Sequence, residues 1–272
     1  MTAPALPLSD PLVRRLSGAP LVLLLDIDGT LSPIAPRPEY ATVPDETQRV
    51  LAALADLRNV HVAVISGREA ADARRLIGLD VVWVIGNHGF EIAAPHQPAE
   101  PRPIVVPFEH AIATAVSRAR AIASEMPGVL VEDKRWTMSI HYRLAHPRDV
   151  PALVADTERI ADDLELKLTR GKEVLELRPP IDVDKGTASV DLVTSLGALH
   201  SGASILCAGD DRTDEDAFRA LRLAHPSAVT VRVGGQDTHQ RTDAEFSVAD
   251  PVAMRVLLES VLEQRGGRLP SN

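Results

Sequence analysis

Hydrophobic residues in the first third of the chain follow two alternating patterns. Continuous apolar runs at 21–25, 60–65 and 81–86 predict short strands that are buried on both faces of a sheet. The segments 44–57 and 68–78 instead space their apolar residues at helical intervals. Strands separated by helices predict a parallel sheet that is covered by helices.

The middle of the chain has a different order of elements. A helix with one apolar stripe is predicted at 108–126, and two strands follow it at 128–133 and 136–144. A second helix is predicted at about 150–163, before a β-hairpin at 164–179. This order predicts an antiparallel sheet with helices on one face.

The last third returns to the alternation of strands and helices. Helical patterns are found at 185–197, 213–222 and 251–264, and strand-like runs lie at 203–209 and 228–234. We therefore predict an α/β fold with a Rossmann-like parallel-sheet core, made by residues 1–107 and 183–272. The α+β domain at 108–182 is predicted to be inserted into this core.

Charge and cysteine content narrow the possible functions. The net charge of -9 over 272 residues argues against a nucleic-acid partner, because tracking phosphates requires clustered Lys and Arg. An anionic substrate must therefore meet its positive charge locally. The single cysteine, Cys207, lies in an apolar run and predicts a buried side chain in a reducing compartment. With no signal-peptide pattern and no apolar run of ~20 residues, we expect a cytoplasmic protein without a membrane partner.

Two carboxylates follow the first predicted strand. Asp26 and Asp28 come directly after 21–25, and residues two apart on a strand project to the same side. Ligands collect beyond the carboxyl ends of parallel strands, and paired carboxylates need a cation or a proton. The alternative is that Asp28 and Gly29 only start a turn.

A second acidic group follows the run at 203–209. Asp210 and Asp211 come directly after that run, and Asp214 lies in the first turn of the next predicted helix. A favourable interaction with the helix dipole would account for Asp214, but not for the two carboxylates at the strand end. Ligand sets made only of oxygen favour Mg²⁺.

Positive and hydroxyl groups accompany these carboxylates. Ser66 and Arg68 follow the strand at 60–65, where turn and helix-capping chemistry is the alternative to phosphate binding. Lys185 begins a predicted helix, where its charge opposes the helix dipole and calls for a nearby anion.

Four motifs occur in order along the chain, namely D-x-D-G-T, S-G-R, K-G and G-D-D-x-T-D-E. In this order they resemble the motifs of the haloacid dehalogenase superfamily of phosphotransferases. The strings "GDDRTDEDAF", "GNHGFE", "EDKRWTMSIHYR" and "LELRP" further resemble the trehalose-6-phosphate phosphatases. This resemblance covers nearly the whole chain, and it implies a hydrolase core with an inserted cap domain.

The resemblance implies roles for the core residues. Asp26 is implied as the nucleophile that forms an aspartyl-phosphate, and Asp28 as the general acid and then the general base. Ser66 and Lys185 are implied to bind the transferred phosphoryl group. The implied Mg²⁺ is held by the Asp26 carboxylate, the Asp28 backbone carbonyl and Asp210, while Asp211 and Asp214 fit better as indirect or water-mediated partners.

The resemblance also implies which residues contact the sugar. These are polar residues of the cap and of the rim of the core, namely Glu132, Lys134, Glu176, Asn87, His88 and Arg68. For Glu176 the alternative is a solvent-facing charge in an alternating strand, and we place His141 and Arg143 outside the site for the same reason. The substrate is expected to be trehalose 6-phosphate.

Three other functions use the same core motifs. The chain could hydrolyse another glycosyl phosphate, bind a sugar phosphate as a silent sensor, or act as a mutase. A pure sensor would not need both Asp26 and Asp28. We expect a monomer that acts on a small sugar phosphate, with functional coupling to a separate synthase as an option.

Overall fold

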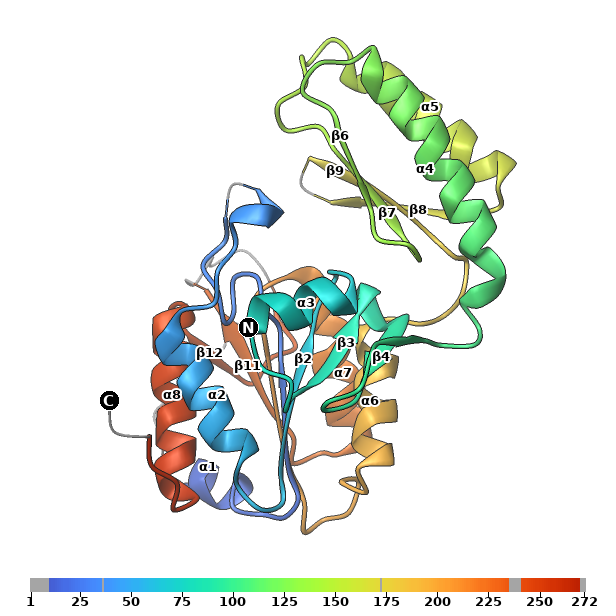
Figure 1. Cartoon of the computed structure of the whole chain (residues 1–272). Coiled ribbons are helices and arrows are strands. Elements are labelled where there is room, and N and C mark those ends of the chain that lie inside the picture. The colour runs from blue at the N-terminus through green and yellow to red at the C-terminus, as the bar shows by residue number, and fades with distance from the viewer. Residues whose placement is uncertain (1–9, 36, 172, 235–240, 270–272) are drawn as a thin grey trace. The chain divides into compact units, whose positions relative to one another are not determined.

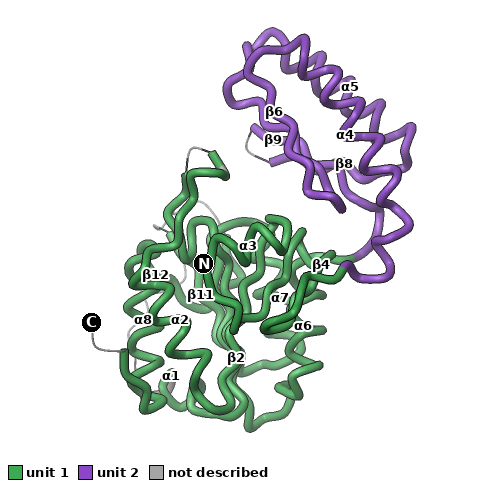
Figure 2. The backbone as a smooth tube through the Cα atoms, in the orientation of Figure 1, with its two compact units in different colours: residues 1–100, 183–272 green, residues 101–182 purple. Residues whose placement is uncertain are grey.

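The computed structural model describes residues 10–35, 37–171, 173–234 and 241–269. The chain divides into two compact units, one made by Met1–Glu100 with Val183–Asn272 and the other by Pro101–Asp182 (Figure 2). Each unit has its own sheet and its own apolar core.

The larger sheet has the strand order β12-β11-β10-β1-β2-β3-β4-β5. Its neighbours from β12 to β3 pair in parallel, and β4 then pairs antiparallel with β3. The strands are β1 Leu21–Leu25, β2 Val60–Ile65, β3 Trp83–Gly86, β4 Glu91–Ala93, β5 Glu100–Pro101, β10 Ser204–Gly209, β11 Val229–Val233 and β12 Phe246–Val248. Strand β1 lies between β10 and β2, so the two ends of the chain build one sheet.

Helices cover both faces of this sheet, which explains why every residue of β1 is buried (Figure 1). Leu21, Leu23 and Leu25 belong to one apolar cluster with the first, second, third and eighth helices. Val22 and Leu24 belong to another with the sixth and seventh helices. The helices are α1 Asp10–Arg15, α2 Asp45–Ala55, α3 Ala70–Ile77, α6 Lys185–Ser195, α7 Arg212–Ala224 and α8 Pro251–Gln264, with short 3-10 turns at η1 Pro38–Tyr40 and η2 Asn87–Gly89.

The second unit has an antiparallel sheet in the order β6-β7-β9-β8. Its strands are β6 Leu130–Asp133, β7 Met138–His141, β8 Lys167–Gly171 and β9 Val174–Arg178, and its helical elements are η3 Val106–Phe108, α4 Glu109–Ser124 and α5 Val150–Asp163. Met138, Ile140, Leu175 and Leu177 alternate along β7 and β9 and pack in one apolar cluster with both α-helices. The opposite face of the sheet therefore carries the polar residues.

The predicted fold class is confirmed, because a mainly parallel α/β core carries an α+β insert. The predicted insert, 108–182, lies within the second unit, which also includes residues 101–107. Helix α1 and strands β4, β5 and β12 are short and were not predicted from the sequence. Within the described part of the chain, no helix is long and apolar enough to cross a membrane.

Helix α7 offers a matched test of core packing. Leu221 is 0% exposed, whereas Leu223 on the same helix is 86% exposed. Leu221→Ala should lower the free energy of unfolding by about 2–5 kcal/mol through lost burial and a cavity. Leu223→Ala should change it by less than about 0.5 kcal/mol. Urea denaturation measures both variants, and equal effects would contradict this account of the core.

Candidate active site

Functional side chains of the larger unit meet at the carboxyl edge of its parallel sheet. Asp26 follows β1, Ser66 follows β2 and Asp210 follows β10. Lys185 and Asp214 come from the first turns of α6 and α7, which pack against each other. This edge of a parallel sheet is where α/β proteins bind ligands.

Lys185 joins two of the carboxylates. Its Nζ lies 2.7 Å from Asp26 Oδ1 and 2.8 Å from Asp214 Oδ1, and all three side chains are buried. Burial alone would lower the pKa of Lys185, but the charges of Asp214 and Asp26 raise it well above its ordinary value. The buried lysine is therefore a cation held between two carboxylates, which accounts for its otherwise unfavourable place at the start of a helix.

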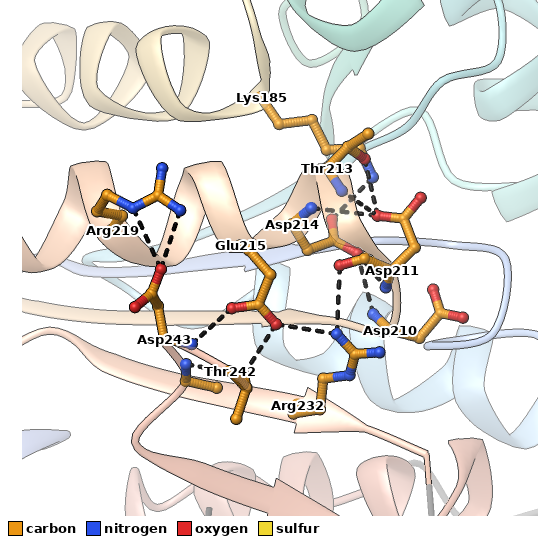
Figure 3. Close-up of polar contacts among 11 residues, drawn as sticks. Lys185, Asp210, Asp211, Thr213, Asp214, Glu215, Arg219, Arg232, Thr242 and Asp243 are labelled. Carbon is orange, nitrogen blue, oxygen red and sulfur yellow. Dashed lines mark hydrogen bonds and ion pairs between the residues drawn. The ribbon is translucent and has the colours of Figure 1, made fainter. Parts of the chain in front are cut away.

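Local hydrogen bonds fix where these helices begin. Asp184 caps α6 by accepting from the Thr187 backbone N–H at 2.7 Å, which makes Lys185 the first helical residue. Asp211 caps α7 by accepting from the backbone N–H groups of Thr213 and Asp214, at 2.8 and 3.1 Å (Figure 3). Carboxylates at this position satisfy N–H groups that have no partner within the helix.

Asp214 orients the loop after β10. Its Oδ2 accepts from the backbone N–H groups of Asp210 and Asp211, at 2.9 and 3.0 Å. One carboxylate thus holds Lys185 with one oxygen and the loop with the other (Figure 3). Asp214 has a direct structural role in the site as well as a candidate ligand role.

Three carboxylates could hold a cation. Asp26, Asp210 and Asp214 each offer an oxygen, and these oxygens lie within 4.8 Å of one another. We call these residues the carboxylate cluster. Gly29 lies directly against it, because a Cβ at Gly29 would be 2.1 Å from Asp210 Oδ2, and its φ of +88° also favours glycine.

The negative charge of the carboxylate cluster is only partly balanced by Lys185. Burial, with Asp211 and Asp214 nearby, raises the pKa of Asp210 to about 7. Burial also raises the pKa of Asp214 to about 6, although Lys185 opposes this shift. The pKa of Asp26 is raised well above its ordinary value, again chiefly by burial. A divalent cation would relieve this repulsion, and an oxygen-only donor set suits a hard cation.

Asp211 differs from its neighbours. Burial would raise its pKa, but Lys185 and the hydrogen bonds from Asp214 and Thr213 lower it below its ordinary value. Its Oδ1 is engaged by the cap of α7. Asp211 does not belong to the carboxylate cluster.

Asp28 is held by an arginine. Arg68 Nε and Nη2 donate to the two oxygens of Asp28 at 2.7 and 2.8 Å, while Arg68 Nη1 donates to Asp72 at 2.9 Å. Asp72, in the first turn of α3, thereby fixes the guanidinium. Burial would raise the pKa of Asp72, but the hydrogen bonds and charges of Arg68 and Arg75 lower it. Ser66 is buried beside them and accepts from the Arg68 backbone N–H at 3.2 Å.

The predicted rim residues Asn87 and His88 lie in a strained turn. Both have left-handed backbone angles, with φ of 49° and 54°. Their N–H groups donate to the carbonyls of Arg68 and Ser66, at 2.7 and 3.0 Å. Strain of this kind persists only where the surroundings enforce it, and it is common at functional sites.

Glu91 enforces this turn and was not singled out by the sequence analysis. Its buried Oε2 accepts from Asn87 Nδ2 and from the Ala70 backbone N–H, both at 2.8 Å. It therefore ties the turn to the start of α3. The string "GNHGFE" contained Glu91, but neither spacing nor residue type distinguished this carboxylate from an ordinary surface charge.

The second unit has a polar cluster of its own, on the face of its sheet opposite α4 and α5. Lys134 Nζ lies 3.5 Å from Glu176 Oε1 and 4.0 Å from Glu132 Oε2. His141 Nε2 lies 2.9 Å from the same oxygen of Glu132. We call these four residues the Lys134 cluster. The structure brings the three predicted residues together and adds His141, which the strand alternation had placed outside the site.

Glu215, next to Asp214 in the chain, serves a different contact. Its carboxylate accepts from Arg232 Nη1 at 2.9 Å, Thr242 Oγ1 at 2.8 Å and the Asp243 backbone N–H at 2.6 Å (Figure 3). Glu215 thus fastens the segment that leads into β12 to the first turn of α7. The sequence had indicated only that a carboxylate in this first turn complements the helix dipole, so this contact of Glu215 was not predicted.

The fold and the site together define a class of protein. A haloacid dehalogenase-like hydrolase from Bacteroides thetaiotaomicron shares the fold at a TM-score of 0.62, with 14% identity over 89% of this chain and 98% of that one. A trehalose-6-phosphate phosphatase related protein has a TM-score of 0.76 at 28% identity, over 88% of this chain and 96% of that one. The chain has the haloacid dehalogenase-like hydrolase fold.

Sequence comparison specifies the family. The trehalose-phosphatase family model matches residues 24–252, so the chain belongs to the trehalose-phosphatase family, as its motifs predicted. It is 33% identical to trehalose-phosphate phosphatase B of Arabidopsis thaliana over 95% of this chain and 71% of that protein. It is 38% identical to an uncharacterized glycosyl hydrolase of Mycobacterium tuberculosis over 80% of this chain. The match spans 17% of that glycosyl hydrolase and 64% of a trehalose-phosphate phosphatase from Mycolicibacterium paratuberculosis.

The raised pKa values predict that cation binding releases protons. At about pH 6.5 Asp210, with a pKa of about 7, is mostly protonated, and a cation binds only the ionised form. Titration of metal-free protein with Mg²⁺ should therefore release more than about half a proton per ion from Asp210, and this contribution should be much smaller at about pH 8.5. Calorimetry in two buffers of different ionisation enthalpy measures the release. Identical heats in the two buffers at the lower pH would contradict the charge balance described for the carboxylate cluster.

Proposed function

We propose that this protein hydrolyses trehalose 6-phosphate to trehalose and phosphate, through an aspartyl-phosphate intermediate. One observation carries the proposal, namely Lys185 held between Asp26 and Asp214 beside Asp210 at the carboxyl edge of the sheet. Family membership supports the substrate, since relatives of this chain are named trehalose-phosphate phosphatases.

Asp26 is the proposed nucleophile. Its Oδ1 accepts from Lys185, and within the described part of the chain no donor is placed on its Oδ2. That oxygen forms the bond to phosphorus while the bond from phosphorus to the sugar oxygen breaks. Lys185 and the Ser66 hydroxyl bind the phosphoryl oxygens, and Lys185 supplies the local positive charge that the acidic chain otherwise lacks.

Asp28 is the proposed general acid and base. It gives a proton to the departing sugar oxygen and later takes one from the water that attacks the aspartyl-phosphate. Arg68 holds both oxygens of Asp28 and orients that carboxylate. This pair must open at one oxygen for Asp28 to carry its proton. Separate groups are needed because the nucleophile must be ionised while its neighbour carries a proton.

Mg²⁺ is the proposed cofactor, with Asp26, the Asp28 backbone carbonyl and Asp210 as its holders. The surplus of negative charge in the carboxylate cluster and the close approach of Gly29 to Asp210 support this assignment. When bound, the ion neutralises phosphoryl charge and orients the phosphate. Asp214 positions the loop after β10 and Asp211 caps α7, each through hydrogen bonds to backbone N–H groups.

The Lys134 cluster is the proposed site for sugar hydroxyls. Lys134 Nζ lies 3.5 Å from Glu176 and 4.0 Å from Glu132, so one donor stands between two acceptors. Such groups bind vicinal hydroxyls, and binding energy from the sugar can lower the barrier at the phosphate. Asn87, His88 and Arg68 are proposed to contact the substrate from the core.

The cellular setting is part of the proposal. A buried free cysteine, Cys207, supports a reducing cytoplasmic location. The proposed partner is a small sugar phosphate, bound by a monomer that acts after a separate synthase.

Substitution of the two aspartates tests the chemistry. Asp26→Asn should abolish phosphate release from trehalose 6-phosphate, because an amide cannot form the acyl phosphate. Asp28→Asn should reduce kcat by about 10²–10⁴-fold, the usual scale for a positioned acid and base. Circular dichroism is the control for folding. Turnover near that of the wild type in Asp26→Asn would rule out the covalent mechanism.

Substitution of Glu176 tests the sugar site. Glu176→Ala should lower kcat/KM for trehalose 6-phosphate by about 10²-fold, because hydroxyl recognition is lost. Its effect on p-nitrophenyl phosphate, which has no sugar, should be slight. Equal losses on both substrates would indicate that Glu176 has only a structural role. If the wild type cleaved glucose 6-phosphate as efficiently as trehalose 6-phosphate, the disaccharide substrate would be refuted.

A further inference from the structure

We propose that Ser139 is a further specificity-determining residue, whose hydroxyl binds the sugar at the floor of the Lys134 cluster. This inference rests on the proposed function and adds a residue that neither the motifs nor the family match assigns.

Strand register places Ser139 at the centre of the cluster. On β7 it lies directly opposite Glu132 of β6 on one side and Glu176 of β9 on the other. Directly paired residues of antiparallel strands project on the same face, with Cβ atoms about 4.5–5.5 Å apart. The two carboxylates proposed to bind the sugar therefore flank the Ser139 side chain.

The neighbours of Ser139 along β7 show that this is not a core position. Met138 and Ile140 point to the other face and pack in the apolar cluster with α4 and α5. A serine on the polar face is short, and it lies below the longer side chains of Glu132, Lys134, Glu176 and His141. These side chains reach toward one another through their ion pairs, which explains why Ser139 is only 2% exposed.

The hydroxyl of Ser139 is available for a ligand. Among the hydrogen bonds found in the described residues, none uses it, although two carboxylates stand beside it. A sugar hydroxyl can both donate to the Ser139 hydroxyl and accept from it. Sugar binding would exchange the ion pairs above Ser139 for hydroxyl contacts and bring the substrate onto this floor.

Three variants and two substrates test this assignment. Ser139→Ala should lower kcat/KM for trehalose 6-phosphate about 5–20-fold, mainly through a higher KM, because one hydroxyl contact is lost. Activity on p-nitrophenyl phosphate should stay within about twofold, because that ester has no sugar to reach Ser139. Ser139→Thr, which keeps the hydroxyl, should recover most of the loss. Ser124→Ala, which removes an exposed hydroxyl from α4, is the matched control and should leave both substrates unaffected.

The possible results distinguish a failure of the role of Ser139 from a failure of the proposed substrate. Unchanged kinetics of Ser139→Ala on trehalose 6-phosphate, with an active wild type, would overturn the role of Ser139 alone. Equal losses on both substrates would also overturn it, because they indicate a structural effect. A wild type that cleaves p-nitrophenyl phosphate but not trehalose 6-phosphate would overturn the proposed substrate, and the role of Ser139 with it.

Discussion

The ion pairs of Lys185 are the interaction on which the site depends. A buried ammonium is costly unless anions surround it, and here two carboxylates from different elements do so. Asp26 follows the first strand and Asp214 opens a helix near the end of the chain, so one side chain links the two halves of the core. Removing either carboxylate would change the charge balance of the whole cluster.

Strand ends were the most informative feature of the sequence. Apolar runs that stop at a carboxylate or a hydroxyl identified Asp26, Ser66 and Asp210, because a parallel sheet brings such ends together. The same alternation of apolar runs and helical patterns predicted the fold class. It did not predict β12, since three residues carry too little periodicity to stand out from a loop.

Contacts between distant side chains could not be predicted in the same way. Glu91 reaches the start of α3, and Asp72 reaches a guanidinium that also binds Asp28, but neither residue has a distinctive sequence setting. His141 illustrates the limit best. Alternation along β7 correctly gives it a polar face, yet only the pairing of strands shows that this face also carries Glu132.

The split core has a consequence for biosynthesis. Strand β1 pairs with β10, residue 21 with 204 through residue 25 with 208. The centre of the sheet therefore cannot form until residues 204–208 have been synthesised. The second unit is continuous in sequence and can complete its own sheet while the rest of the chain is still being made. Lys185, Asp210 and Asp214 are all translated after that unit. A nascent chain therefore carries a folded insert before its catalytic site is complete. At that stage the apolar strands of the unfinished core are still exposed to aggregation and to chaperones.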